Sequence, residues 1–212
     1  MILEGFNFSI NFLKDNYVKL ISLLLLPLIL ELALNIVLSS YINEEESLAA
    51  ILTFLGLTLQ TWAQCIVILF LVKTESSKSN SDIYIFTLYK LPLIILWSLL
   101  IGIVITLGFL LLIIPGIYIY LRYAFYIFEL LLSPKKSLEA LRDAFSMTQG
   151  KVFEIFTYLL PLVVVIILFA ILIFSITDLL IVELLFSYIL ITISFAYTYY
   201  LYNQIKRGIN GT

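Results

Sequence analysis

The chain has 212 residues, of which 63% are hydrophobic and only 12% are charged, and its mean hydropathy is +1.13. A water-soluble domain of this length needs more polar side chains to cover its surface, so the composition excludes that class and indicates a protein that lipid surrounds. The formal net charge of −2 gives no basic field for nucleic acid, and a chain without His and with one Cys has no His-based metal site or His-dependent triad. We therefore expect no nucleic-acid partner, no metal and no cofactor.

Six apolar stretches are long enough to cross a bilayer, because a hydrocarbon core about 30 Å thick needs roughly 20 helical residues. They cover approximately residues 18–39, 48–72, 92–114, 117–132, 152–177 and 179–204. The sequence therefore predicts an all-α integral membrane protein, a six-helix bundle formed as a single transmembrane domain over residues 1–212.

Pro115 and Gly116 interrupt the central apolar stretch. A single helix from Leu93 to Leu132 would be about 60 Å long, twice the thickness of the hydrocarbon core. Pro suits position i+1 of a type II turn and Gly suits position i+2, because Pro fixes φ and Gly accepts a positive φ. We therefore predict two spans joined by a tight hairpin at Pro115-Gly116, in preference to one long helix with a proline kink.

The basic residues support an even number of spans. With six crossings both termini lie on one side, and eleven of the twelve Lys and Arg residues fall on that side, Arg122 being the exception. The opposite loops hold Glu44, Glu45, Glu46 and Asp178 and no basic residue. Because positively charged loops stay in the cytoplasm, we predict a multi-pass protein of a prokaryotic cytoplasmic membrane with both termini cytoplasmic.

Three segments on the predicted cytoplasmic side resemble one another, since each is followed by a Lys and then by a span. They are residues 6–16, 81–89 and 137–148. We predict three approximate repeats, residues 1–76, 77–132 and 133–212, each an interfacial amphipathic helix followed by a transmembrane hairpin.

The third segment has the clearest amphipathic pattern. Leu138, Leu141 and Phe145 lie on one helical face, and Arg142 lies on the opposite one. A helix of this kind lies in the headgroup plane. It either orients the following span, or it binds a partner or senses lipid. Membrane lipids are the expected partners, with a protein partner at the cytoplasmic face as a second candidate, and the sequence does not indicate an oligomeric state.

The stretch from Ile113 to Lys151 contains IPGIYIYLRYAFYIFELLLSPKKSLEALRDAFSMTQGK. It resembles the membrane-domain family named after glycerophosphoryl diester phosphodiesterases, in which a PGIY hairpin opens a span of the xxRxxF type and an ALxxSxxLTxGK-like amphipathic helix follows. The matching positions are Pro115, Gly116, Arg122, Phe125, Ala140, Leu141, Thr148, Gly150 and Lys151. The resemblance implies a polytopic membrane domain of poorly known function. It does not imply phosphodiesterase activity, which belongs to a separate soluble domain in some members.

Three ionisable side chains are expected at a similar depth. Glu31 and Arg122 lie roughly 20 Å and 22 Å from the inner surface by helical rise, and Glu183 enters the sixth span to a comparable depth. Because a buried arginine stays charged and needs a partner, we predict a cluster of Arg122 with Glu31, Glu183 or both, with Asp178 just above. The cluster is either a salt bridge that locks the spans or an outer-half polar pocket for an anionic headgroup or solute, and snorkelling of Arg122 to the outer surface is a third interpretation.

Other polar side chains within the spans could extend the lining of such a site. They are Asn35, Gln60, Gln64 and Glu129. Equally, side chains of this kind form hydrogen bonds between spans without any further role. The sequence leaves both interpretations open.

The sequence favours a membrane protein without enzymatic activity that binds, senses or moves a lipid or small amphiphile through the outer-half polar site. One alternative is a small-solute secondary transporter or channel, which the repeats and buried charges support. Another is a membrane scaffold that recruits partners through its cytoplasmic surface helices. An intramembrane enzyme is the least favoured class, because the chain lacks His, a GxSxG motif and a Gly-rich phosphate loop.

Overall fold

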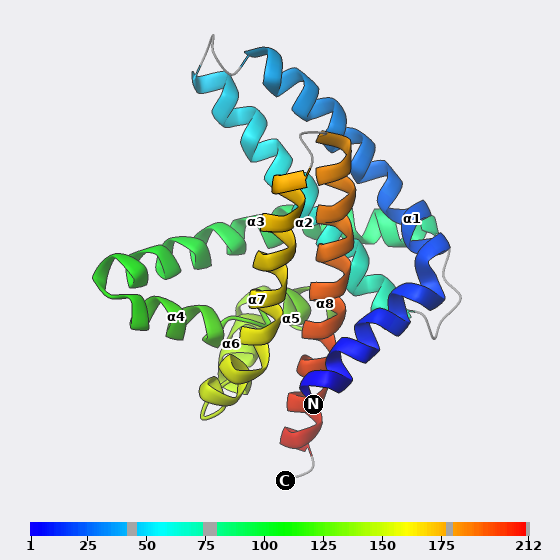
Figure 1. The fold of residues 1–212 in the computed structure, drawn as a ribbon. Coiled ribbons are helices and arrows are strands. Elements are labelled where there is room, and N and C mark those ends of the chain that lie inside the picture. Colours follow the sequence, from blue (N-terminus) through cyan, green and yellow to red (C-terminus); the bar gives the residue numbers. More distant parts are fainter. Residues whose placement is uncertain (42–45, 74–79, 177–179, 211–212) are drawn as a thin grey trace.

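The computed structural model describes residues 1–41, 46–73, 80–176 and 180–210, and within these ranges the regular structure is entirely helical (Figure 1). The helices in chain order are α1 (Ile2–Tyr41), α2 (Glu46–Lys73), α3 (Asn80–Leu111), α4 (Ile113–Arg122), α5 (Tyr126–Leu132), α6 (Ser137–Met147), α7 (Val152–Ile176) and α8 (Leu180–Asn210). The predicted all-α fold class is confirmed.

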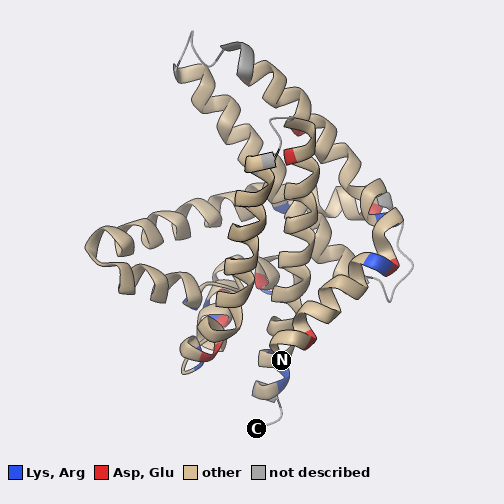
Figure 2. Cartoon of the chain, viewed as in Figure 1, with Lys and Arg blue, Asp and Glu red and all other residues tan. Residues whose placement is uncertain are grey.

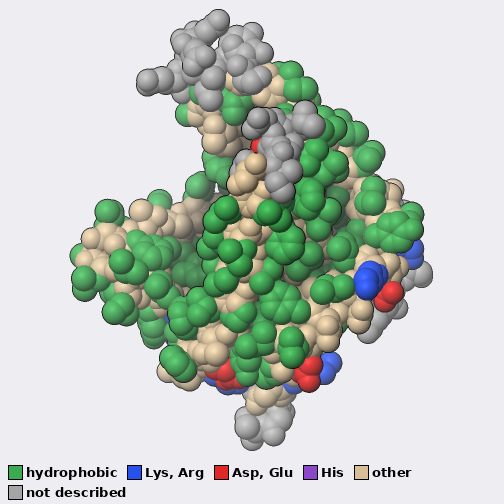
Figure 3. Space-filling view, in the orientation of Figure 1, with side chains coloured by type: hydrophobic (Ala, Val, Ile, Leu, Met, Phe, Trp, Pro, Cys, Tyr) green, Lys and Arg blue, Asp and Glu red, His purple; other side chains and the backbone are tan. Residues whose placement is uncertain are grey.

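Six helical segments are long and apolar enough to cross a membrane. They are Ile2–Leu38, Ser47–Val72, Ser81–Leu111, Ile113–Leu132, Val152–Ile173 and Leu180–Gly208. Hydrophobic side chains cover most of the face seen in Figure 3, as expected of a surface that contacts lipid. The chain is therefore a multi-pass membrane protein.

The helices form three antiparallel pairs, α1 with α2, α3 with α4 and α7 with α8, which diverge from a shared centre (Figure 1). In that view α7 and α8 stand side by side, the α1–α2 pair leans away at the upper end, and the α3–α4 hairpin projects to the left, across the direction of α7 and α8. The first turns of α1 contact the last turns of α8, where the Tyr200 hydroxyl donates a 3.0 Å hydrogen bond to Glu4. Both ends of the described chain therefore lie at the same end of the molecule.

The surface segments of the three predicted repeats do not all form separate helices. In the first two, the surface segment and the following span form one helix, α1 and α3 respectively. Only in the third is the surface helix separate, as α6, because Gly150 adopts φ +74° between α6 and α7. A positive φ ends a helix readily at Gly, which has no Cβ to clash with the backbone.

The hairpin between α3 and α4 does not turn at Pro115-Gly116, so that prediction is wrong. The chain turns at Leu112, and Pro115 lies in the first turn of α4, where its missing N–H removes no helical hydrogen bond. Gly116 is buried against α3: a Cβ there would lie 2.5 Å from Cγ of Phe109, and a Cβ on Gly108 would lie 3.0 Å from the Gly116 Cα. The glycines therefore allow close packing of two helices rather than a turn.

The second half of α2 forms the centre of the core. From Trp62 to Leu71 nearly every side chain is buried, and Ala63 and Cys65 are fully inaccessible. The Trp62 indole N–H donates a 2.9 Å hydrogen bond to Thr87 of α3, so a polar atom in this core has a partner. Because α2 contacts α1, α3, α5 and α8, it holds the diverging pairs together.

Candidate functional site

Glu31 is a buried carboxylate that joins three helices, but it does not meet Arg122. Its side chain is 2% exposed. It accepts a 2.7 Å hydrogen bond from the Gln60 amide of α2 and a 2.8 Å hydrogen bond from the Tyr188 hydroxyl of α8. Neutral donors therefore satisfy this carboxylate, and the predicted ion pair with Arg122 is wrong.

Arg122 lies instead at the end of α4, beside the surface helix α6. It is 4% exposed, and its guanidinium carbon is 3.7 Å from the centroid of the Phe145 ring and 6.0 Å from that of Tyr118. The Thr148 hydroxyl donates a 3.0 Å hydrogen bond to the Arg122 carbonyl and holds the two segments together. The predicted pairing assumed straight, parallel spans, whereas α4 points across the direction of α7 and α8 and ends beside α6 (Figure 1).

Glu183, a second predicted member of the cluster, does not pair with Arg122. Glu183 lies half-buried in the first turn of α8, and among the described residues no carboxylate lies within ion-pair distance of Arg122. Asp178 lies outside the described residues. The three described members of the predicted cluster therefore lie in separate environments.

The residues predicted as a polar lining also separate. Gln60 binds Glu31, whereas the Asn35 side chain donates a 2.9 Å hydrogen bond to the Glu31 backbone carbonyl, within its own helix. Gln64 is half-buried on α2. Glu129, on α5, belongs to a different site.

Glu129 forms an ionic site with the last turns of α8. The carboxylate is 6% exposed and accepts hydrogen bonds from the Tyr202 hydroxyl at 2.8 Å and the Lys206 ammonium at 2.9 Å. The Lys206 ammonium also donates a 2.6 Å hydrogen bond to the Tyr202 oxygen. Sequence reasoning missed this triad, although Tyr202 and Lys206 are four residues apart and so share a helical face.

The α6 helix is amphipathic, as predicted, but its apolar residues divide between two environments. Leu141 is buried with Ala140 and Ala144, whereas Leu138 is 51% exposed and Phe145 is 40% exposed. Arg142 is exposed on the same helix. Leu138 and Phe145 are therefore free to contact lipid while Leu141 anchors α6 to the bundle.

A salt bridge fixes the start of α6. The Lys135 ammonium donates a hydrogen bond to the Asp143 carboxylate across the linker before the helix. The hydrogen bond and the charge of Asp143 raise the pKa of Lys135 above its ordinary value.

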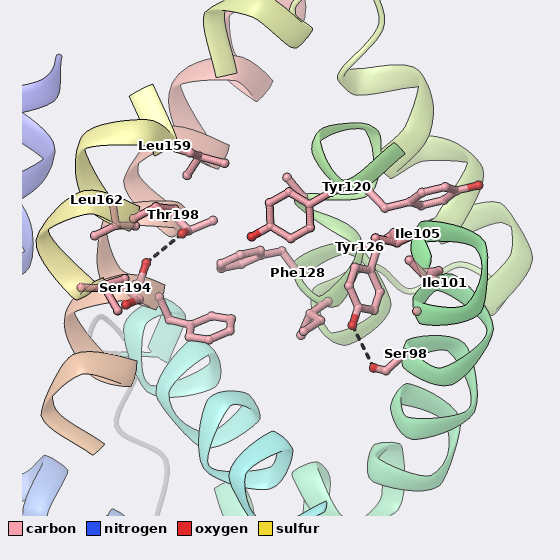
Figure 4. Close-up of a pocket in the computed structure, with 17 residues that line it drawn as sticks. Ser98, Ile101, Ile105, Tyr120, Tyr126, Phe128, Leu159, Leu162, Ser194 and Thr198 are labelled. Carbon is pink, nitrogen blue, oxygen red and sulfur yellow. Dashed lines mark hydrogen bonds between the residues drawn. The ribbon is translucent and has the colours of Figure 1, made fainter. Parts of the chain in front are cut away.

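A cleft separates the α3–α4 hairpin from the α7–α8 pair. Its volume is about 390 Å³, and α3, α4, α5, α7 and α8 all contribute to its walls. Figure 3 shows a hollow between the projecting hairpin and the central helices. Aliphatic and aromatic side chains form most of the surface, among them Ile101, Ile105, Phe128, Leu159 and Leu162 (Figure 4).

The few polar groups in the cleft are hydroxyls. The Tyr126 and Ser98 hydroxyls lie 2.8 Å apart and hydrogen bond to each other on the α3 side, and the Thr198 hydroxyl donates a 2.7 Å bond to the Ser194 carbonyl on the α8 side (Figure 4). Because the Ser98, Tyr126 and Thr198 hydroxyls have partners within the protein, the cleft is an apolar chamber in which few hydroxyls, such as that of Tyr120, are left for further hydrogen bonds.

A second pocket of about 340 Å³ adjoins the cleft. It lies between α3 and α6, and Ile101 and Tyr123 line both cavities. Arg142 and Phe145 of α6 contribute to its wall. An apolar region therefore continues from the centre of the molecule to the surface helix.

Together these features define a polytopic α-helical membrane protein with an apolar cleft between diverging helix pairs. No family model, curated protein or solved structure matches the chain. The resemblance of residues 113–151 to the phosphodiesterase-associated membrane domains stays a prediction from the sequence. Among the described residues, no group of three His, Cys, Asp or Glu side chains could hold a metal ion.

Proposed function

We propose that the protein is a non-catalytic membrane protein that binds, senses or moves a lipid or small amphiphile, and that the cleft between the α3–α4 hairpin and the α7–α8 pair holds the apolar part of this ligand. The observation that carries the proposal is the cleft itself, about 390 Å³ in volume and lined mainly by apolar side chains. This binding site differs from the outer-half polar site predicted from the sequence, because Arg122 does not pair with Glu31 or Glu183.

The size and chemistry of the cleft favour an acyl chain over a hydrated solute. Ligand sites in proteins commonly have volumes of about 300–1,000 Å³ and are mostly apolar, with a few polar groups that fix orientation. A solute pathway would need side chains that replace water around the solute. Here Ser98 and Tyr126 satisfy each other, so the walls offer little to a polar solute.

A substitution at Gly102 can test whether the cleft holds a ligand. It lines the cleft on α3, and a Cβ added there would meet no atom within 4 Å. We expect Gly102→Phe to place its ring in the cleft without disturbing the backbone of α3. Native mass spectrometry of the gently extracted protein should then show at least a several-fold loss of bound amphiphile relative to the unmodified protein.

Two matched variants control for unrelated effects. Gly102→Ala leaves most of the cleft open and should retain the ligand. Leu96→Phe adds an aromatic ring elsewhere on α3, where Leu96 is 53% exposed and does not line the cleft, and it should also retain the ligand. Equal ligand occupancy in Gly102→Phe and Leu96→Phe, with equal melting temperatures, would contradict the proposal.

A further inference from the structure

We infer that the pocket between α3 and α6 recognises the anionic headgroup of the amphiphile, with Arg142, Arg122 and the Trp97 indole as the groups that select it. This inference rests on the proposed function and adds the charge of the ligand and the place where that charge binds. The ligand class is an anionic, singly or doubly acylated lipid whose chain enters the adjoining cleft.

The pocket has walls of two kinds. Leu100 and Val104 of α3 and Leu141 of α6 form an apolar wall. Arg142 of α6 contributes a charged group, and Trp97 lines the opposite side from α3, with its indole N–H buried in the wall. A pocket with this division suits a molecule that has one apolar end and one charged end.

Two donors next to this pocket lack acceptors. Trp97 Nε1 and Arg122 Nε are both buried and have no hydrogen-bond partner within the described part of the chain. Leaving a buried donor unpaired costs about 1–3 kcal/mol, so such groups normally have a partner in the functional state. Trp97 lines the pocket, and Arg122 stacks on Phe145, which also lines it. Both unpaired donors therefore lie next to the pocket, Trp97 Nε1 in its wall and Arg122 Nε behind Phe145.

The charged side chain in the pocket wall is a cation. The described residues that line it include Arg142 and no Asp or Glu. Arg122 is 4% exposed, and among the described residues its guanidinium has the faces of Phe145 and Tyr118 as its electrostatic partners. An aromatic face stabilises a guanidinium less than a neighbouring anion stabilises it. Burying a cation without an anion therefore costs folding free energy. A phosphate or carboxylate oxygen would supply the missing acceptor for a guanidinium geometry that favours bidentate pairing.

The surroundings favour a lipid over a soluble anion. The helix α6 presents Leu138 and Phe145 outward beside Arg142, as interfacial helices do at the headgroup level. The pocket also continues past Ile101 and Tyr123 into the apolar cleft, which an inorganic anion would leave empty. A headgroup beside Arg142 with an acyl chain along α3 fills both cavities.

Trp97 is also a probe of this site, because the chain has only one other Trp, the buried Trp62. The experiment measures quenching of Trp fluorescence in the full-length protein by lipids brominated on their chains, with phosphatidylglycerol compared with phosphatidylcholine at equal mole fraction. Trp97→Phe gives the signal of Trp62 alone, which is subtracted. We expect Trp97 to select the anionic lipid at least three-fold over the zwitterionic one.

The variants separate charge recognition from general contact with lipid. Arg142→Gln, at an exposed position, should reduce the selectivity toward one without changing the melting temperature. Lys14→Gln, which removes an exposed cation from α1, should leave the selectivity unchanged. A selectivity of one in the unmodified protein, or an equal loss in Lys14→Gln and Arg142→Gln, overturns the inference. The Gly102→Phe comparison still tests the proposed function in that case, because it depends on occupancy and not on headgroup charge.

Discussion

The contact between Glu129 and Lys206 shows how single residues hold the α5 and α8 ends together. Glu129 is almost fully buried, whereas Lys206 is 47% exposed and reaches it from α8. Among the described residues, replacing Lys206 with Met should leave the buried carboxylate with the Tyr202 hydroxyl as its remaining hydrogen-bond partner. We expect a loss of about 1–3 kcal/mol in the free energy of unfolding, in the range for an incompletely satisfied buried group. Thermal or denaturant unfolding in detergent measures it.

The same substitution in a Glu129→Gln protein tests whether the loss of stability comes from the charge of Glu129. With Glu129→Gln already present, the buried group is neutral, so adding Lys206→Met should cost clearly less than it does in the unmodified protein. Lys14→Met, an exposed lysine on α1, should change stability by less than about 0.5 kcal/mol. Equal losses from Lys206→Met in both backgrounds would contradict a role for charge compensation.

The buried charges could be identified from the sequence, but their partners could not. Glu31, Arg122 and Glu129 all stand out as ionisable residues in apolar stretches, and all three are buried. Pairing them requires the relative tilt of the helices, which depends on packing contacts such as Gly108 with Gly116. The Tyr188 hydroxyl donates a hydrogen bond to the Glu31 carboxylate. Because tyrosine is neutral, matching opposite charges in the sequence does not find this partner.

At the scale of elements, the α3–α4 hairpin depends on close contact between two glycines. A Cβ on Gly108 would lie 3.0 Å from the Gly116 Cα, which is backbone and cannot rotate away. Gly108→Ile should therefore force the two helices apart and cost about 1–3 kcal/mol, as overpacking typically does. Gly102→Ala on the same helix meets no atom within 4 Å and should be neutral or slightly stabilising. Comparing the melting temperatures of the two variants in detergent tests this, and a loss of the same size in both would contradict a specific role for the contact between Gly108 and Gly116.

The elements themselves follow closely from hydropathy, with exceptions at their boundaries. All six predicted spans correspond to helical segments that are long and apolar enough to cross a membrane. The prediction placed the turn at Pro115-Gly116 because this pair suits either a type II turn or the first turn of a helix. Choosing the helix requires knowledge of how α4 packs against α3. The continuity of α1 and α3 was missed because amphipathic and apolar segments can share one helix when no residue with a positive φ separates them.

At the scale of the whole molecule, the tip of the α3–α4 hairpin differs from the other two hairpin tips. From Leu107 to Ile117 the chain carries no polar side chain, whereas residues 43–46 and 177–178 include carboxylates. Leu112 and Ile114 at the turn are 69% and 80% exposed, and the outer part of the hairpin carries no charge (Figure 2). The turn also satisfies part of its own backbone, since the Leu112 N–H donates to the Gly108 carbonyl. Such a surface is stable in hydrocarbon and unfavourable in water.

We therefore expect the α3–α4 tip to remain in contact with lipid chains, and cysteine labelling tests this directly. The single native cysteine, Cys65, is fully buried, so a Cys65→Ala protein gives a background without a reactive thiol. In nanodiscs, which expose both membrane faces, Leu112→Cys should react with a charged maleimide at least ten-fold more slowly than Ser47→Cys, an exposed position at the start of α2 beside the carboxylates of residues 44–46. Detergent-unfolded samples of both variants should label equally and so confirm that each thiol is intact. If Leu112→Cys reacts as fast as Ser47→Cys in nanodiscs, the tip emerges into water, and its apolar side chains then require a protein partner or a second copy of the chain to cover them.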